Sequence, residues 1–191
     1  MINFNELDEN EMKRRKHIGD VAPGGKKARG HSDQEGIAIR PAASMDYGFI
    51  RALSKEVFSL YGDYEEILIQ WFVNPDVITI VSFKQGQSLG FAMLYAMSGE
   101  ILAIAVKPEF QGRGIGTGLL NNIERIASQL GMERLLLHIA TENEVAEMFF
   151  RNASFTVIGK KGGYYPRGQA ALTMAKEIGM GHRASGKKQK Y

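Results

Sequence analysis

The stretch ILAIAVKPEFQGRGIGTG, residues 101–118, joins a strand, a glycine-rich turn and the start of a helix. Its six apolar residues, Ile101–Val106, are typical of a strand that is covered on both faces, and Pro108 ends that strand. Three glycines in the five residues Gly112–Gly116 precede a helical pattern. Successive backbone N–H groups converge at such a turn, the helix dipole favours negative charge, and glycine lets an anion approach closely. The stretch therefore predicts a phosphate-binding site.

Hydrophobic periodicity predicts helices and strands on both sides of this stretch. Upstream, we expect a strand at Ile37–Arg40, helices at Ala43–Leu60 and Glu65–Phe72, and strands at Val77–Phe83 and Leu89–Met97. Downstream, we expect a helix that ends at Gly131, a strand at Leu135–Ala140, a helix opened by a capping box of Thr141 and Glu144, and strands at Phe155–Gly159 and Ala170–Lys176. This order predicts a mixed α/β fold in which helices pack on a mixed sheet.

Composition divides the 191 residues into one predicted domain and two charged ends. Residues 1–36 hold seven basic and seven acidic residues and few large apolar ones. This composition predicts a disordered extension, in which a short helix can form before residue 18. Residues 37–178 carry the periodic patterns and form the predicted domain. Residues 179–191 hold four basic and no acidic residues, which predicts a flexible basic tail.

The charge and apolar patterns exclude several function classes. The net charge of +3 comes from the basic tail, whereas residues 37–178 hold 13 basic and 14 acidic residues, so no nucleic-acid partner is expected. No apolar run reaches the length of a membrane span and the polar N-terminus is no signal peptide, so we expect a cytoplasmic protein without a membrane partner. The absence of cysteine excludes disulfides and thiolate chemistry. The glycine spacing G-x-G-x-G excludes a Rossmann fingerprint.

The element order and the glycine-rich turn resemble the GCN5-related N-acetyltransferase (GNAT) superfamily over residues 37–177. Gln111, Gly114 and Gly116 match the family pattern Q/R-x-x-G-x-G/A. The residues that are similar to the family's second motif are Asn143, Ala146, Phe149-Phe150 and Phe155. The segment Tyr164-Tyr165-Pro166, with the strand after it, resembles the branch that acetylates protein N-termini, which includes the ribosomal-protein alanine acetyltransferases.

This resemblance implies both a fold and a reaction. The fold is a splayed, mostly antiparallel sheet flanked by about four helices. The reaction transfers an acetyl group from acetyl-CoA to a primary amine in a ternary complex, and the acceptor implied is the α-amine of a protein or peptide N-terminus. A small-molecule amine, such as an amino acid, a polyamine or an antibiotic, is the alternative, and a non-catalytic acyl-CoA-binding module is a second one. No metal is expected, and a monomer or a homodimer is expected.

The resemblance also implies which residues contact the cofactor. Backbone amides of Gly112–Thr117 would hold the pyrophosphate with the help of Arg113, and the backbone of Ile104–Val106 would pair with the pantetheine arm. Asn143 would contact that arm from the other side, and Phe150 would lie near the thioester. The full set of cofactor-binding residues is Ile104, Ala105, Val106, Gln111, Gly112, Arg113, Gly114, Ile115, Gly116, Thr117, Asn143 and Phe150.

Two residues are candidates for the base that deprotonates the amine. An α-amine needs only modest help, because its pKa lies near ~8 whereas that of a lysine lies near ~10.4. His138, on the predicted fifth strand, takes the position of a catalytic glutamate in the ribosomal-protein branch; a hydrogen-bonded core histidine is the other interpretation. Glu100 matches the base of the histone-acetylating branch and by strand alternation shares a face with Leu102, Ile104 and Val106. A solvated turn residue is the alternative for Glu100.

The candidates for the general acid and for substrate contact are tyrosines. Several relatives carry a proton-donating tyrosine where this chain has Phe150. Tyr165, and after it Tyr164, is the candidate to replace that acid or to contact the first residue of the acceptor; an aromatic pair that packs over the loop is the alternative. Tyr61 is a further candidate for substrate contact, because the loop between the first two helices shapes acceptor specificity in this family. A lone surface tyrosine is the alternative for Tyr61.

Overall fold

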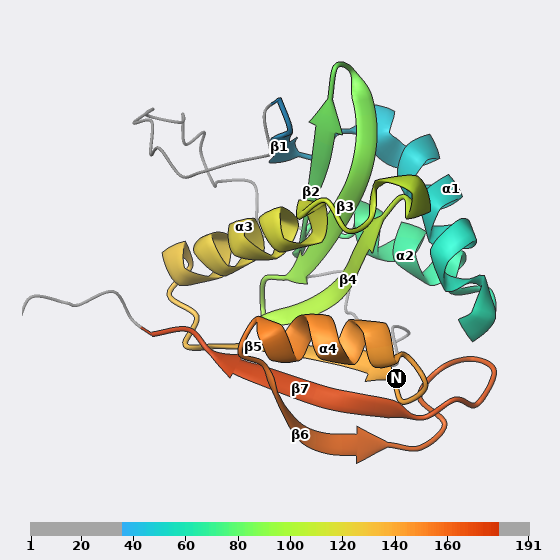
Figure 1. Cartoon of the computed structure of the whole chain (residues 1–191), viewed down its shortest axis with the longest axis vertical. Helices are drawn as coiled ribbons and strands as arrows, with labels where there is room; N and C mark the ends of the chain where they lie inside the picture. The colour runs from blue at the N-terminus through green and yellow to red at the C-terminus, as the bar shows by residue number, and fades with distance from the viewer. Residues whose placement is uncertain (1–35, 180–191) are drawn as a thin grey trace, which may run out of the picture. The chain divides into compact units, whose positions relative to one another are not determined.

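The computed structural model describes residues 36–179 (Figure 1). The predicted disordered extension, its short helix and the predicted flexible tail lie outside these residues, apart from Gly36 and Gly179. Within the described residues the chain forms seven strands, four α-helices and three short 3-10 helices. No helix in this part of the chain has the length and apolar character needed to cross a membrane.

The elements follow one another in the predicted order, and the mixed α/β fold is confirmed. The strands are β1 (Ala38–Pro41), β2 (Val77–Lys84), β3 (Gln87–Tyr95), β4 (Glu100–Val106), β5 (Arg134–Ala140), β6 (Thr156–Lys161) and β7 (Ala171–Glu177). The α-helices are α1 (Tyr47–Phe58), α2 (Tyr64–Val73), α3 (Ile115–Gln129) and α4 (Glu144–Asn152). The short 3-10 helices are η2 (Ser44–Asp46), η3 (Ser59–Tyr61) and η4 (Pro108–Phe110).

The sheet is nearly divided in two between β4 and β5. Its strand order is β1-β2-β3-β4-β5-β7-β6, and every neighbouring pair is antiparallel except β4 and β5. These two parallel strands have seven residues each but pair only where Glu100 faces Leu136 and Ile101 faces Leu137. Beyond that point they diverge, as Figure 1 shows, and leave a gap in the middle of the sheet. The predicted splayed sheet is therefore present.

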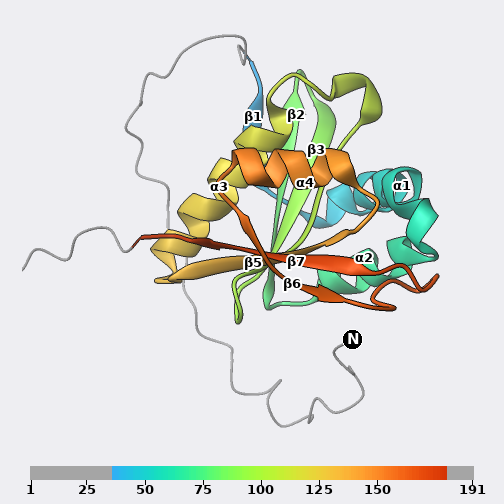
Figure 2. The ribbon, with the colours of Figure 1, turned by 60° about the horizontal axis from the view of Figure 1, so that its bottom comes forward.

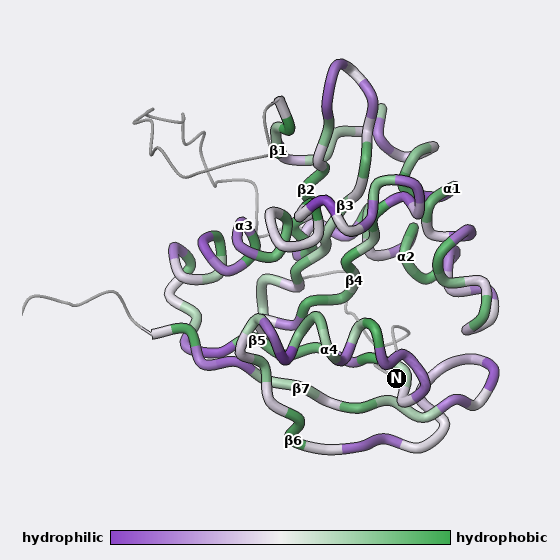
Figure 3. Tube along the Cα trace, viewed as in Figure 1, coloured by the Kyte–Doolittle hydropathy of each residue, from purple (hydrophilic) through white to green (hydrophobic). Residues whose placement is uncertain are grey.

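Helices cover the two faces of the sheet and bury two separate apolar clusters (Figure 2). On one face, α1 and α2 bury residues such as Ile50, Leu53 and Leu68 against β2, β3 and β4. On the other face, α3 and α4 bury residues such as Leu119 and Phe150. Figure 3 shows the apolar stretches concentrated in the central strands, whereas the tip of the β2–β3 hairpin is hydrophilic. The two clusters hold the halves of the sheet in place on either side of the gap.

The helix after the glycine-rich turn follows its sequence pattern closely. Its buried positions recur at helical spacing, at Leu119, Leu120, Ile123 and Ala127. The predicted stop at Gly131 is confirmed, since Gly131 adopts a φ of 77° just after the last helical turn. The Gly131 N–H donates to Ser128 O and the Met132 N–H donates to Ala127 O, which is a Schellman ending. The start and the end of α3 are thus both set by glycines.

Two predicted helix starts differ from the structure. The first helix begins at Tyr47 rather than Ala43, because the buried Asp46 accepts hydrogen bonds from the Ala43 N–H and from Arg40, which fixes a 3-10 turn before it. The capping box led by Thr141 was wrong. Asn143 is the N-cap of α4, and its Oδ1 accepts from the Ala146 N–H at 3.0 Å. Both Thr and Asn are good N-caps, and the turn that ties the Asn143 N–H to Ala140 O selects the later one.

Candidate active site

A cavity of about 660 Å³ lies between β4, the glycine-rich turn and α4. All of the residues predicted to bind the cofactor line it, apart from Ala105 and Arg113. Four further residues complete its lining, namely Phe110, Val145, Ala146 and Phe149. The sequence stretch that predicted a phosphate site therefore forms one wall of this cavity, and the second motif forms the opposite wall.

Ala105 and Arg113 stand apart from the cavity for different reasons. The Ala105 side chain is buried on the opposite face of β4, in the cluster under α1 and α2, because strand neighbours alternate in direction. Only its main chain is left to contact a ligand. The Arg113 guanidinium donates to Glu109 O at 3.0 Å and lies 5.2 Å from the centre of the Phe110 ring. Arg113 thus braces the turn at the rim of the cavity.

The glycine-rich turn forms an open cradle of backbone amides. Gly112 and Gly114 adopt φ values of 72° and 76°, which side chains rarely adopt, and α3 begins directly after them. The first N–H groups of α3, at Ile115 to Thr117, have no carbonyl partner within the helix and point out of its positive end. A Cβ added at Gly112 would meet no atom within 4 Å. The donors, the space and the dipole therefore fit a diphosphate.

A second, smaller cavity of about 130 Å³ occupies the gap between β4 and β5. It shares four lining residues with the first cavity, namely Ile104, Asn143, Ala146 and Phe150. The two cavities are therefore neighbours, and these four residues border both of them. Of the residues that the structure describes, no aspartate or glutamate lines the second cavity, and the remaining lining residues are aliphatic or aromatic, apart from one histidine.

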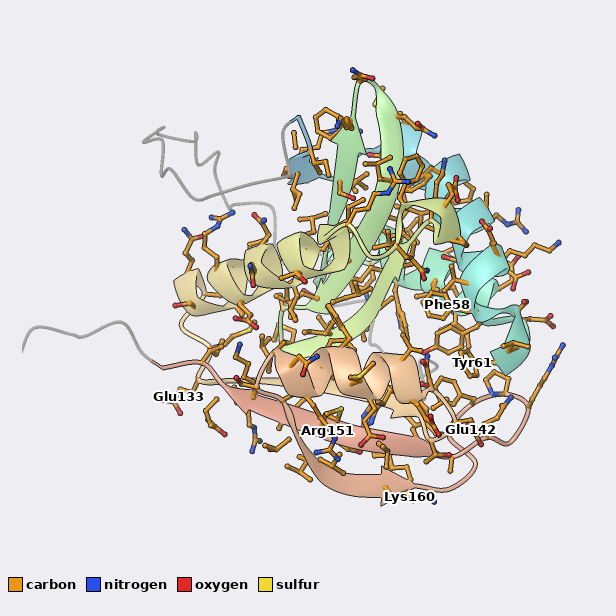
Figure 4. All side chains as sticks on the ribbon, in the orientation of Figure 1. Phe58, Tyr61, Glu133, Glu142, Arg151 and Lys160 are labelled. Carbon is orange, nitrogen blue, oxygen red and sulfur yellow. The ribbon has the colours of Figure 1, made fainter. Side chains whose placement is uncertain are left out.

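One wall of the second cavity is a group of packed aromatic side chains. Tyr61 stacks on Tyr165 with ring centres 4.6 Å apart, and Tyr64 lies 5.7 Å from Tyr165. Asn143 Nδ2 donates to the Tyr61 hydroxyl at 3.4 Å, which joins this wall to the start of α4. Figure 4 shows Tyr61 and Phe58 at the end of α1, on the side of the sheet gap. The lone-surface interpretation of Tyr61 therefore does not hold, because its ring lines the cavity.

The two base candidates, which the sequence could not place relative to each other, lie side by side. Glu100 Oε1 is 3.7 Å from His138 Nε2. The side chains are 21% and 10% exposed, so both are largely buried. They meet because β4 and β5 still pair at Glu100 and Leu136, which brings His138 to the point where the strands begin to diverge. His138 lines the second cavity, and the Glu100 carboxyl lies beside its ring, although Glu100 is not itself a lining residue.

The surroundings of these two groups shift their pKa values in opposite directions. Burial, and then the neighbouring Lys161, lower the pKa of His138 to about 4. Burial raises the pKa of the Glu100 carboxyl above its usual range, while Lys161 opposes that rise. The pKa of Glu100 therefore moves toward neutral pH and that of His138 moves away from it. Of the two, Glu100 is better matched to proton transfer near neutral pH.

A bulge in β4 overturns the predicted face of Glu100. Met93 of β3 pairs with Ala103, but the next residue, Leu94, pairs with Ile101, so Leu102 is an extra residue in β4. Leu102 packs with the α1–α2 cluster and Ile104 packs with the opposite one. Strict alternation would have put both on one face with Glu100. The prediction that Glu100 shares a face with Ile104 and Val106 was therefore wrong.

The two loop tyrosines take different places. Tyr165 is buried and lines the second cavity, and its hydroxyl donates to His138 O at 3.3 Å. Burial raises the pKa of Tyr165 well above its ordinary value, so it keeps its proton. Tyr164 does not line the cavity; its ring packs 4.6 Å from the His138 ring and edge-on against Tyr165. The two tyrosines therefore form an aromatic pair, and Tyr165 in addition lines the cavity.

Sequence reasoning missed several residues that surround the site. Phe58 and Tyr64 line the second cavity, but Phe58 was predicted only as an apolar helix position and Tyr64 lay just before the predicted helix Glu65–Phe72. Lys161 and Thr173 contact the two nitrogens of His138, at 3.2 and 3.1 Å. Strand register would have been needed to find them, since Thr173 pairs with His138 across β5 and β7. Among the described residues, no group of three or more His, Asp or Glu side chains is placed to hold a metal ion.

Sequence comparisons point to acetyltransferases. The profile of the acetyltransferase (GNAT) family matches residues 47–155, which is more than half of the chain. An uncharacterized N-acetyltransferase of Methanocaldococcus jannaschii is 27% identical over 145 residues, 74% of this chain and 92% of that protein. A ribosomal-protein bS18 alanine N-acetyltransferase assigned in Bacillus subtilis is 26% identical over 58% of this chain and 73% of its own length. A spermidine N(1)-acetyltransferase of Thermoplasma acidophilum is 29% identical over 44% of this chain and 53% of its own length.

Solved structures share the fold. Ard1 of Thermoplasma volcanium superposes with a TM-score of 0.66 at 21% identity, covering 75% of this chain and 98% of that one. A GNAT family acetyltransferase of Elizabethkingia anophelis with acetyl-CoA bound gives a TM-score of 0.64 at 17% identity, covering 76% of this chain and all of that one. At these identities the likeness is one of architecture.

Proposed function

The chain belongs to the acetyltransferase (GNAT) family, and we propose that it acetylates the α-amine of a protein or peptide N-terminus. The coarser activity, acetyl-CoA-dependent N-acetyltransfer, follows from the family and from relatives that are named N-acetyltransferases. Relatives span both N-terminal and polyamine acetyltransferases, so the choice of acceptor depends on this chain's own second cavity.

The first cavity would hold the cofactor. When bound, acetyl-CoA supplies the thioester whose acetyl group is transferred. The amides at the start of α3 would hold its diphosphate, and Gln111 keeps the turn against β4 because its Nε2 donates to Val106 O at 3.0 Å. Asn143 and Phe150 line both cavities, so they would stand where the acetyl group meets the acceptor. These side chains orient the reactants and exclude water.

Glu100 would take the proton that the amine loses while the new C–N bond forms and the C–S bond of the thioester breaks. Its pKa, raised by burial, suits this role, and an α-amine with a pKa near ~8 needs only modest help. The departing thiolate resembles a cysteine thiolate with a pKa of about 8.5, so a general acid is not obligatory. Phe150, which has no ionisable proton to donate to the thiolate, is therefore compatible with the reaction.

The lining of the second cavity is the observation that carries the proposal. An acceptor there would contact aromatic and aliphatic walls; no described residue that lines the cavity is a carboxylate, and the Glu100 carboxyl beside His138 is the proposed base. A polyamine would bring a second ammonium into this space, where burying an unpaired charge is strongly unfavourable. An N-terminal residue brings one amine, an uncharged peptide group and a side chain. The cavity is therefore better matched to an N-terminus than to a polyamine.

The proposal is tested with a panel of acceptors at equal concentration. The full chain is incubated with acetyl-CoA and with peptides that have a free N-terminus, matched peptides with a blocked N-terminus and an internal lysine, amino acids, and spermidine. Free thiol release and product mass are measured. We expect turnover with free N-terminal peptides only. Turnover with spermidine or amino acids but not with peptides would replace the proposed acceptor by a small-molecule amine.

A further inference from the structure

We propose that Lys161 is a positioning residue, which holds the His138 ring in a single uncharged tautomer and so leaves Glu100 as the group that takes the acceptor's proton. The second half of this statement depends on the proposed acetyl transfer. The first half concerns the ring alone and can be tested without any activity.

The hydrogen bonds of His138 select one tautomer. Lys161 Nζ lies 3.2 Å from His138 Nε2, and Thr173 Oγ1 lies 3.1 Å from His138 Nδ1. An ammonium group can only donate, so Nε2 must be the nitrogen with the free electron pair. Nδ1 then carries the proton and donates it to the Thr173 hydroxyl. A neutral ring with its proton on Nδ1 satisfies both contacts, whereas a doubly protonated ring would place two donors against each other at Lys161.

The strands place Lys161 where it can do this. Lys161 is the last residue of β6, and β7 lies between β6 and β5, with Thr173 paired to His138 on one side and to Gly159 on the other. Gly159 has no side chain, which leaves the surface of the sheet open for the long Lys161 side chain to cross toward His138. The Lys161 ammonium also lies 5.6 Å from the centre of the Tyr164 ring, an arrangement typical of a cation–π contact.

In the described part of the chain, the groups that contact the His138 ring come from three strands and one loop. They are Glu100 from β4, Thr173 from β7, Lys161 from β6 and Tyr164 from the β6–β7 loop, while Tyr165 contacts the His138 carbonyl. Only Lys161 among them carries a positive charge. Its charge disfavours a proton on His138 and favours the ionised form of Glu100. Both effects free the carboxylate to act as the base.

Nitrogen NMR of the full chain with labelled histidine measures the tautomer and the protonation of the His138 ring. The chain has four histidines, and His138→Gln identifies the signal of His138. We expect the unmodified protein to show His138 as the Nδ1–H tautomer through the neutral range, with protonation only in strong acid. Lys161→Met should raise the pH of protonation by about one unit. Lys161→Arg, which keeps the charge, should stay near the unmodified protein.

Lys160→Met is the matched control, because it removes the same charge from the neighbouring position of β6, where side chains alternate in direction. Figure 4 shows Lys160 at the outer strand. We expect the His138 signal to stay unchanged in this variant. A His138 signal that is identical in Lys161→Met and in the unmodified protein, or one that shows the Nε2–H tautomer, would overturn the assignment.

The activity readout separates this inference from the proposed function. If Glu100 is the base, activity falls as the pH drops through its pKa, and Lys161→Met raises that pKa. The acidic limb of kcat/KM should therefore move to higher pH in Lys161→Met but not in Lys160→Met. If the acidic limb of kcat/KM does not move in Lys161→Met, Lys161 does not act through the pKa of Glu100. If no peptide is acetylated at all, the proposed acceptor fails, while the NMR result still decides the role of Lys161 toward the ring.

Discussion

The two cavities are built in different ways. The first cavity, which would hold the cofactor, is lined by six of the seven consecutive residues 111–117, all except Arg113. The second cavity, which is the proposed acceptor site, and the proposed base beside it are assembled from side chains that are distant in sequence, such as Tyr61, Glu100, His138 and Tyr165. A contiguous backbone site tolerates changes around it, whereas a site of distant side chains can be changed one residue at a time. This is the arrangement expected where the cofactor is common to a family and the acceptor is not.

Glu100→Gln is the variant expected to have the largest effect on one cavity and none on the other. This isosteric change removes the proposed base from the acceptor side and touches no residue of the cofactor cavity, so kcat should fall by about 10²–10⁴-fold while coenzyme A affinity is unchanged. His138→Gln is the paired variant, and it should cost less than about tenfold because the pKa of His138 is low. Steady-state kinetics at neutral pH measure both. A larger loss in His138→Gln would give the role of base to the imidazole.

Gly114→Asp should impair coenzyme A binding in the first cavity. A carboxylate at the turn competes with the diphosphate for the helix N–H groups, and a φ of 76° is strained for a side chain, so coenzyme A affinity should fall by about 100-fold or more. Gly114→Asn has the same size and backbone tolerance without the charge, and its loss should be smaller. Calorimetric titration gives the affinities, and circular dichroism checks the fold. Equal affinity in Gly114→Asp and the unmodified protein would remove the cradle from the proposal.

The same contrast explains how much the sequence could predict. The cradle was predictable because glycines, the strand before them and the helix after them are neighbours in the chain. The closeness of Glu100 and His138 was not, because it depends on where β4 and β5 stop pairing. The extra residue at Leu102 defeats any argument from alternation, since a bulge depends on the partner strand. Lys161 reaches His138 across β7, and only the register of three strands shows it.

Tyr61→Ala tests the proposed acceptor site and should have a moderate effect on peptide binding. The change removes the ring that stacks on Tyr165 and opens the aromatic wall, so the peptide KM should rise by about tenfold with a smaller change in kcat. The affinity for coenzyme A should change little, since Tyr61 does not line that cavity. Tyr47→Ala is the control, because Tyr47 is 39% exposed on α1 and lines neither cavity. An unchanged peptide KM in Tyr61→Ala would take this wall out of acceptor binding.

Tyr165→Phe should have the smallest effect, and it decides whether a general acid is needed. The change keeps the ring in the aromatic wall and removes only the hydroxyl that donates to His138 O, so the free energy of unfolding should fall by about 1 kcal/mol. Because the leaving thiolate has a pKa of about 8.5, kcat should stay within about threefold of the unmodified enzyme. Denaturant unfolding and steady-state kinetics measure the two quantities. A loss in kcat comparable to that of Glu100→Gln would instead make Tyr165 the acid, since its raised pKa keeps the proton in place to be donated.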